Sequence, residues 1–140
     1  MEMREILFRG KRVDNGEWVE GFYVVIAGEN HYIFTGRIDL TQGSIGCEYF
    51  KVDSKTVCRY TGLTDKNGVK IFEGDIVTYN KEYGGKTREK GTVYWCDGAF
   101  WVENVQDEED CGLLGALVKY QLEVIGNVHD NFELLEESNK

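Results

Sequence analysis

The chain contains no proline and only two histidines among its 140 residues. Without proline, turns have to be formed by glycine and by Asn or Asp, and 17 glycines are present. His31 and His129 lie far apart and provide no His-x-x-His or Glu-x-x-His spacing, so the sequence does not indicate hydrolytic zinc chemistry. We expect His31 to be an ordinary strand residue and His129 to be a turn residue.

Long hydrophobic runs are also missing, and none approaches the roughly 18 to 20 residues that a membrane span needs. The first residues carry charges and lack the apolar segment of a signal peptide, so we expect a cytoplasmic protein. In a reducing compartment, cysteines are by default small buried thiols, and no Cys-x-x-Cys pair indicates a metal site. The four cysteines are Cys47, Cys58, Cys96 and Cys111. We expect no metal and no cofactor.

Positive charge is scarce, since the formal net charge is -9 and the isoelectric point is about 4.7. Such a chain repels phosphate backbones, which argues against ordinary nucleic-acid binding. Basic residues cluster within 2–12 and 81–90, but each of these segments also holds two glutamates. We interpret both clusters as solvated loops and strand edges.

Catalytic motifs are absent as well. The serines lack a Gly-x-Ser-x-Gly elbow, and no Walker-type or Gly-x-Gly-x-x-Gly loop occurs. Asp65, Glu73 and Asp75 are the only carboxylates within a patterned block, where a pair could act as acid and base or hold Mg²⁺. A structural role is favoured, because Asp65 is placed to cap a turn and Asp75 follows a glycine. The sequence therefore predicts that the protein is not an enzyme and has no catalytic residues.

The residues that are abundant indicate β-structure. Aromatic residues make up 13% of the chain, and Asx-Gly pairs recur between runs of alternating apolar residues. This pattern predicts an all-β fold: an SH3-like small barrel over about 69–128, preceded by an N-terminal β-hairpin unit, with one or two short helices near the C-terminus. Strands are expected at 18–26, 31–35, 49–52, 56–60, 76–79, 91–95, 99–103 and 122–128. We expect a single domain, 1–140, with a subdivision into 1–54 and 55–140.

Local signals add further expectations. Residues 36–46 are polar and rich in glycine and are interpreted as an irregular loop, while Gly21 inside a long apolar run is interpreted as a bulge. The acidic run 107–110 is interpreted as the start of a short helix over 113–118, because acids complement a helix N-terminus. Residues 130–140 are expected to form a final helical turn and a frayed tail. The glycines of three predicted turns are expected to need positive φ: Gly68, Gly74 and Gly98.

Four aromatic residues around the third Asx-Gly turn allow two interpretations. Tyr94, Trp95, Phe100 and Trp101 could form a stacking platform for single-stranded nucleic acid. Strand alternation sends about half of them inward, and no dense basic surround accompanies the others. We therefore favour core and interface packing for these residues.

The block at residues 60–77 runs Tyr-Thr-Gly-Leu-Thr-Asp-Lys-Asn-Gly-Val-Lys-Ile-Phe-Glu-Gly-Asp-Ile-Val. Together with residues 4–10 and with Leu-Glu-Val-Ile-Gly-Asn at 122–127, it resembles the YopX-like family of phage and prophage proteins. One departure is Phe132, where the family pattern often has proline. The residues that form this structural signature are Tyr60, Thr61, Gly62, Leu63, Asp65, Gly68, Glu73, Gly74, Asp75, Ile125, Gly126 and Asn127.

The resemblance brings no catalytic residues, and it implies a phage or prophage origin and self-association. The favoured function is that of a phage-encoded, non-catalytic accessory protein of unknown biochemical activity. Its expected location is the cytoplasm of the host cell, and it would act as a homo-oligomer or on a host or phage protein. Two alternatives remain: an acidic inhibitor that mimics nucleic acid and occupies a basic groove of a host protein, and a weak nucleic-acid binder. Surplus aromatic residues, more than one small barrel buries, also favour a subunit interface.

Overall fold

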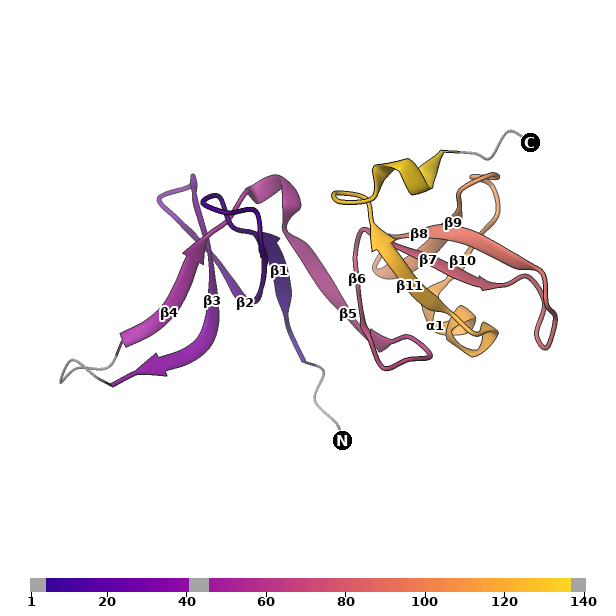
Figure 1. Cartoon of the computed structure of the whole chain (residues 1–140), viewed down its shortest axis with the longest axis horizontal. Coiled ribbons are helices and arrows are strands. Elements are labelled where there is room, and N and C mark those ends of the chain that lie inside the picture. The colour runs from indigo at the N-terminus through magenta and orange to yellow at the C-terminus, as the bar shows by residue number, and fades with distance from the viewer. Residues whose placement is uncertain (1–4, 41–45, 137–140) are drawn as a thin grey trace. The chain divides into compact units, whose positions relative to one another are not determined.

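The computed structural model describes residues 5–40 and 46–136, which form two antiparallel β-sheets (Figure 1). The chain divides into two compact units, residues 1–60 and 61–140. The prediction of an all-β fold is confirmed. The single domain 1–140 and its subdivision at residue 54 stay predictions. Among the described residues, no helix has the length and apolar character needed to cross a membrane.

The first unit is built from strands in the order β4-β3-β2-β1-β5. Their bounds are β1 Phe8–Lys11, β2 Trp18–Ile26, β3 Asn30–Asp39, β4 Gly46–Lys51 and β5 Cys58–Thr64, with a short 3-10 helix η1 at Ser54–Thr56. The predicted strand at 18–26 agrees with β2 at both ends. The Asn-Gly turn before it is also confirmed, because Gly16 has a φ of 73°.

Gly21 lies in β2 for a different reason from the one predicted. The register between β1 and β2 is continuous through the pair of Phe8 and Gly21, so no bulge interrupts this pairing. A Cβ on Gly21 would instead lie 2.0 Å from the backbone oxygen of Phe34. Only glycine allows the backbone of β3 to come this close.

The prediction of an irregular loop over 36–46 is wrong for residues 36–39. Strand β3 continues through Asp39 and pairs with β4, and the register shifts between Phe34 and Ile38. Gly36, with a φ of 87°, lies inside this shift, as expected for a bulge glycine. The sequence pattern looked like the end of a strand because a bulge breaks the alternation without ending the pairing. Residues 41–45 lie outside the described residues.

The core of the first unit is small. Its buried apolar residues are Ile33, Val52 and Cys58, each at most 3% exposed. A Cβ on Gly10 would lie 3.2 Å from both Ile33 Cδ1 and Val52 Cβ, so the backbone of β1 packs directly on these side chains. His31 is a strand residue of β3, and its Nδ1 lies 2.6 Å from the hydroxyl of Tyr23.

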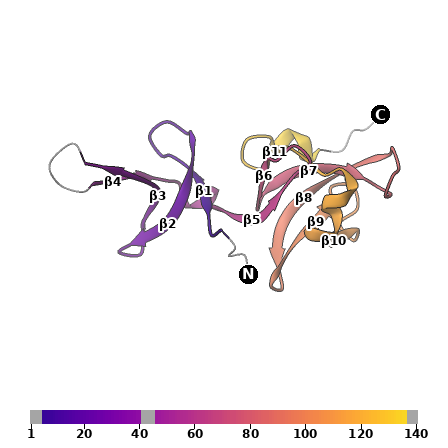
Figure 2. The same cartoon turned by 90° about the horizontal axis from the view of Figure 1, so that it is seen from below.

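In the second unit the last part of β5 pairs with β6, and a five-stranded sheet has the order β10-β9-β8-β7-β11 (Figure 2). The bounds are β6 Lys70–Phe72, β7 Asp75–Asn80, β8 Arg88–Cys96, β9 Ala99–Asn104, β10 Cys111–Leu113 and β11 Glu123–Asn127. Strands β10 and β11 are the two ends of this sheet, and among the described residues no closed barrel is found. The SH3-like barrel is therefore not confirmed.

The acidic run at 107–110 does not start a helix, contrary to the prediction. It forms a loop closed by a bond from Asp110 N to the Asp107 oxygen, and it leads into β10. The helix α1, Leu114–Leu117, begins after β10, and its N-cap Leu113 makes no side-chain capping bond. Pairing of residues 111–113 with β9 takes precedence over the weak helix signal, since tertiary pairing overrides local propensity. The 3-10 helix η2, Val118–Tyr120, follows directly.

The predicted hairpin of residues 91–103 is confirmed, because Val93 pairs with Val102 and both are buried. Trp95 pairs with Phe100, and their ring centroids are 4.8 Å apart. The main core also contains Ile71, Val77, Tyr79, Leu114 and Leu122. The predicted final helical turn is the 3-10 helix η3, Phe132–Leu135, whereas residues 137–140 lie outside the described residues.

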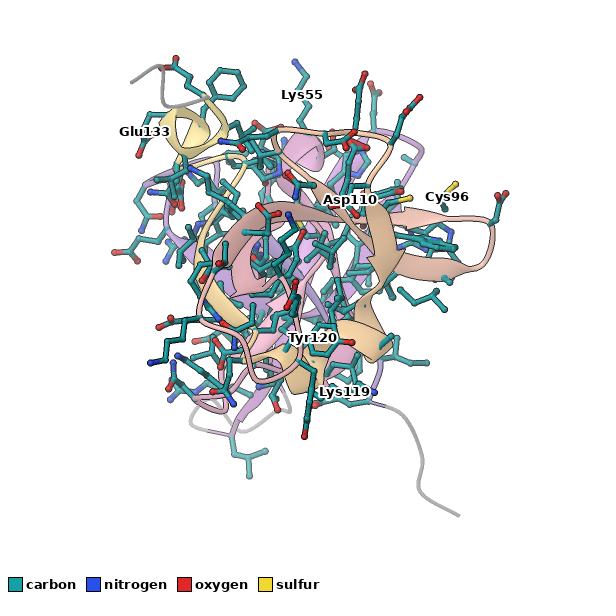
Figure 3. The ribbon with its side chains drawn as sticks, turned by 90° about the vertical axis from the view of Figure 1, so that its right-hand side faces the viewer. Lys55, Cys96, Asp110, Lys119, Tyr120 and Glu133 are labelled. Atoms are coloured by element: carbon teal, nitrogen blue, oxygen red, sulfur yellow. The ribbon has the colours of Figure 1, made fainter. Side chains whose placement is uncertain are left out.

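The expectation that the cysteines are buried thiols is correct for Cys58 alone. Cys47, Cys96 and Cys111 are exposed, and all four are free thiols. Cys96 lies on the β8–β9 hairpin (Figure 3). These three cysteines belong to strands of which only one face is covered, so strand alternation turns them to solvent.

Candidate interaction surface

Asp65 follows β5 and is 6% exposed. Its Oδ1 accepts hydrogen bonds from Asn67 N at 2.8 Å and Val69 N at 2.9 Å, and its Oδ2 accepts one from Val124 N at 2.9 Å. Burial is the largest influence on this carboxyl and raises its pKa, but the three backbone donors and the charge of Lys66 together lower the pKa below its ordinary value. Asp65 therefore shapes the turn that contains Gly68 and ties it to β11.

The second patterned turn, Glu73-Gly74-Asp75, is organised in the same way. Asp75 is 1% exposed, and its Oδ2 accepts a hydrogen bond from Phe72 N at 2.7 Å. Gly74 has a φ of 88°, and its carbonyl accepts a bond from Val128 N at 2.9 Å. These contacts hold the carboxylate of Asp75 in the backbone of the turn rather than in an open site.

The remaining signature residues lie in β5 and β11. In β5, Tyr60 N donates to Leu7 O at 2.8 Å, Thr61 Oγ1 donates to Ile71 O at 2.7 Å, Gly62 has a φ of 87°, and Leu63 packs on the core. In β11, the pairing with β7 shifts between Val124 and Gly126, which leaves Ile125 39% exposed at a bulge.

The turn after β11 explains the last two signature residues. A Cβ on Gly126 would lie 2.5 Å from Asn131 Oδ1. Asn127 Oδ1 accepts bonds from His129 N at 3.0 Å and Asp130 N at 2.9 Å, so His129 is a turn residue as predicted. The structure thus brings the block at 65–75 and the strand at 125–127 together, and both serve to dock β11 onto the sheet.

The signature gathers no reactive cluster. Within residues 5–40 and 46–136, no group of three or more His, Cys, Asp or Glu could hold a metal ion. A cavity of about 370 Å³ in the second unit includes Ile125 as its single signature residue. Arg88 also lines this cavity, and its guanidinium donates to Asn80 Oδ1 at 2.9 Å and Thr78 Oγ1 at 2.7 Å. These two hydrogen bonds link β8 to β7.

The most unusual surface lies on the first unit. Phe22 pairs with Phe34, and Phe34 pairs with Tyr49, so these three side chains form one row on one face of β2, β3 and β4. Phe22 is 58% exposed and Tyr49 is 55% exposed. We call the following residues the apolar face: Phe22, Val24, Ile26, Tyr32, Phe34 and Tyr49. Val24 and Ile26 are 36% and 49% exposed.

Ring contacts order this surface. Phe34 and Tyr49 stack with centroids 5.3 Å apart, and Tyr32 meets Tyr49 edge-on at 5.6 Å. Such pairs hold the side chains in place, which lowers the entropy that binding would cost. On the same face, Arg9 and Lys11 of the neighbouring strand β1 lie over the ring of Trp18, the first residue of β2.

Residues 7–136 match the family model for YopX, described as YopX protein. The chain belongs to the YopX family. Its fold is similar to the crystal structure of protein EF1440 from Enterococcus faecalis, with a TM-score of 0.64 and 29% sequence identity. That match covers 96% of this chain and 100% of the other. No curated protein matches the chain.

Sequence reasoning on this YopX protein missed the apolar face, because it weighed only the aromatic residues at 94–101 as a binding platform. Of those, Trp101 donates from Nε1 to Cys96 O at 2.9 Å, and Phe100 packs on the core. A signal for the apolar face was present: β2 is apolar on both faces, a pattern typical of a strand covered on both sides. On one face the chain buries Gly21 and half-buries Val19 and Tyr23, although Val25 at the end of that face is 45% exposed. On the other face it leaves Phe22, Val24 and Ile26 exposed.

Proposed function

We propose that this YopX protein is a phage- or prophage-encoded, non-catalytic accessory protein that binds another protein chain through the apolar face of its first unit. The observation that carries the proposal is the exposure of Phe22 and Tyr49 on either side of Phe34. Exposed apolar area costs about 25 cal/mol per Å², and contiguous patches of large apolar side chains typically mark interaction sites. A partner chain would remove this area from water.

The proposal excludes an enzymatic role, and the state of the two buried signature carboxylates supports that choice. Asp65 and Asp75 both accept hydrogen bonds from backbone N–H groups, which leaves them structural. A general base or metal ligand needs lone pairs directed at a substrate or ion. We propose that the protein works in the cytoplasm of the host cell, without a cofactor, as a homo-oligomer or on a host or phage protein.

We retain the SH3-like barrel as part of this proposal. Its support is the strand order, because the last strand β11 lies beside β7, the first strand of the meander β7-β8-β9-β10. The 3-10 helix η2 directly before β11 also fits such a barrel.

A second candidate function is the acidic mimic of nucleic acid. Residues 61–140 contain eight Lys or Arg and sixteen Asp or Glu, a formal net charge of -8. A surface of this sign suits a basic groove on a host protein. A mimic would bind such a protein and ignore DNA, whereas a DNA binder would bind DNA with an affinity that falls steeply with salt.

The test compares the wild type with the double variant Phe22→Ser, Tyr49→Ser. Self-association is measured by sedimentation velocity, and capture of host and phage proteins is measured by mass spectrometry after a pull-down with the tagged chain. A matched control is Phe132→Ser, because Phe132 is 67% exposed but lies in the second unit. We expect the double variant to lose association that the control retains. Association that is equal in all three proteins, or absent from the wild type, would contradict the proposal.

A further inference from the structure

We propose that the partner of the apolar face is an acidic amphipathic helix of a different protein. This inference rests on the proposed function, because it names the chemistry of the partner that the same surface would bind. The apolar stripe of the helix would cover the apolar face, and its carboxylates would meet three cations on the same side of the sheet. We call these cations the cationic border: Arg9, Lys11 and Lys51.

The strand register places the cationic border on the side of the sheet that carries the apolar face. Arg9 pairs with Glu20, which lies two residues before Phe22 in β2. Lys11 lies two residues after Arg9 in β1, and side chains at this spacing point to the same side of a strand. Lys51, at the end of β4, belongs to a row of the apolar face that crosses β3. Cations therefore lie at two corners of the apolar face.

The balance of charge on this side of the sheet favours an acidic partner. Within the described pairs of β1 to β4, three cations and a single carboxylate, Glu20, lie on it, although the whole chain has a net charge of -9. Arg9 and Lys11 are held over the ring of Trp18, at 4.7 Å and 5.6 Å from its centroid. A partner that binds these positioned cations orders fewer side chains. Carboxylates would be attracted to this side of the sheet, and a basic segment would be repelled.

The dimensions of the face fit a helix of about four turns. Lys11 pairs with Trp18, and Lys51 lies three strands away in the row of Val24, six residues further along β2. With strands about 4.8 Å apart and about 3.3 Å per residue, the two lysine positions are roughly 25 Å apart. An α-helix of about 16 residues has this length, and its width of about 10 Å matches the strands β2 to β4. Apolar residues at i, i+3, i+4 and i+7 of the helix would cross the middle of the apolar face.

Single-stranded nucleic acid is a weaker occupant, although aromatic rings with cations beside them can bind it. Stacking of bases needs free ring faces, whereas Phe34 and Tyr49 stack on each other with centroids 5.3 Å apart. One face of the Trp18 ring lies under Arg9. The aliphatic members of the apolar face, both on β2, offer no ring at all. The net charge of -9 would also repel a polyphosphate chain.

The first test selects peptides from a pool with no bias of charge. A display library of random peptides of about 16 residues, the length of the proposed helix, is selected on the immobilised full chain. Peptides that also bind the variant Phe22→Ser, Tyr49→Ser are removed. We expect the remaining peptides to be net acidic, with apolar residues at i, i+3, i+4 and i+7. Remaining peptides that are neutral or basic, or whose apolar residues alternate as in a strand, would overturn the inference.

Charge reversal in the cationic border is the second test. On the variant Lys11→Glu, Lys51→Glu, the same selection should enrich basic peptides, because the new carboxylates would repel acidic ones. The Kd of the best acidic peptide, measured by fluorescence anisotropy, should rise at least about tenfold in this variant. The matched control is Lys81→Glu, Lys86→Glu, which changes the net charge equally through exposed lysines of the second unit. At physiological salt the control should keep the Kd within about threefold of wild type.

The charge-reversed variant must be shown to fold. Lys11 is half-buried and lies over Trp18, so circular dichroism of the double variant is compared with the wild-type spectrum. If the spectra differ, Lys51→Glu alone takes its place, because Lys51 is exposed, and the Kd should still rise. An unchanged Kd in a folded variant would overturn the inference, since the cations would then not contact the helix.

The outcomes separate this inference from the proposed function. A selection that yields no peptide dependent on Phe22 and Tyr49 overturns the inference, and the proposed function is then decided by its own sedimentation and pull-down experiments. A homo-oligomer that forms through the apolar face also overturns the inference but supports the proposed function. Binding of a 20-nucleotide oligothymidine that is lost in Phe22→Ser, Tyr49→Ser would assign the face to nucleic acid and overturn both.

Discussion

Asp65 and Val124 are 59 positions apart in the chain, and Asp65 Oδ2 accepts a hydrogen bond from Val124 N at 2.9 Å. The same carboxylate holds the turn that joins β5 and β6 through its other oxygen. One side chain therefore fixes a local turn and attaches β11 to it. This explains why two sequence blocks so far apart belong to one family signature.

Replacing Asp65 with Asn should weaken the attachment of β11 more than the turn. The amide keeps one acceptor oxygen for Asn67 N and Val69 N, but its NH₂ group would face Val124 N, which is also a donor. We expect a loss of about 1 to 3 kcal/mol in the free energy of unfolding, measured by urea denaturation. The control is Asp53→Asn at the exposed cap of η1, which should cost less than about 1 kcal/mol.

The stability that Asp65 contributes should depend on pH. Its pKa is lowered from 3.8 in the folded protein, so its ionised form is stabilised by folding. That contribution is complete well above pH 3.8 and is lost as the pH falls through 3.8 toward the lower folded pKa. The difference in unfolding free energy between wild type and Asp65→Asn should shrink as the pH is lowered over this range. A constant difference would show that ionisation of Asp65 does not matter.

Gly21→Ala should be strongly destabilising, because the new Cβ would lie 2.0 Å from a backbone oxygen of β3 that cannot move without disturbing the sheet. We expect a loss of more than about 2 kcal/mol, comparable with severe overpacking. Gly115→Ala is the matched control. Nothing lies within 4 Å of that position in α1, and alanine there should be neutral or stabilise by about 0.5 to 1 kcal/mol. The melting midpoint should therefore fall in Gly21→Ala and stay unchanged or rise in Gly115→Ala.

Changing Gly68 or Gly98 to alanine should each lower the free energy of unfolding by about 1 kcal/mol. Both have a φ of 81° and open space around the missing Cβ, so the whole effect comes from backbone strain. The predicted turn positions of Gly68, Gly74 and Gly98 are confirmed by their φ values. Unchanged melting midpoints in Gly68→Ala and Gly98→Ala would show that these turns relax without strain.

We expect no hydrolase, nuclease or transferase activity from the purified protein. The assay includes Asp65→Asn, Glu73→Gln and Asp75→Asn beside the wild type. An activity that copurifies with the wild type and disappears in one of these variants would make the signature block an active site. A background activity that is equal in all four proteins would not depend on these three carboxylates.

Much of the strand pattern could be predicted because turns are local. Asn15-Gly16, Asn67-Gly68 and Asp97-Gly98 each place a glycine at positive φ, and the strands between them follow from alternation. The errors arose where a distant strand decided the outcome. Pairing with β4 carries β3 past Gly36, and pairing with β9 keeps Cys111–Leu113 in a strand. Neither partner is visible within a short window of sequence.

The sequence by itself determined the β-rich class, the turn glycines and the family, because these depend on residue types at short spacing. Only the tertiary structure decided what the residues do. Hydrogen bonds from Val124 N and from the backbone of the turn lower the pKa of Asp65. The packing of the first unit leaves Phe22 and Tyr49 exposed to solvent. The physical reason is that burial depends on which of the two faces of a strand the rest of the chain covers. Alternation shows that β2 is apolar on both faces, but only the packed chain shows that Phe22, Val24 and Ile26 stay exposed along one of them.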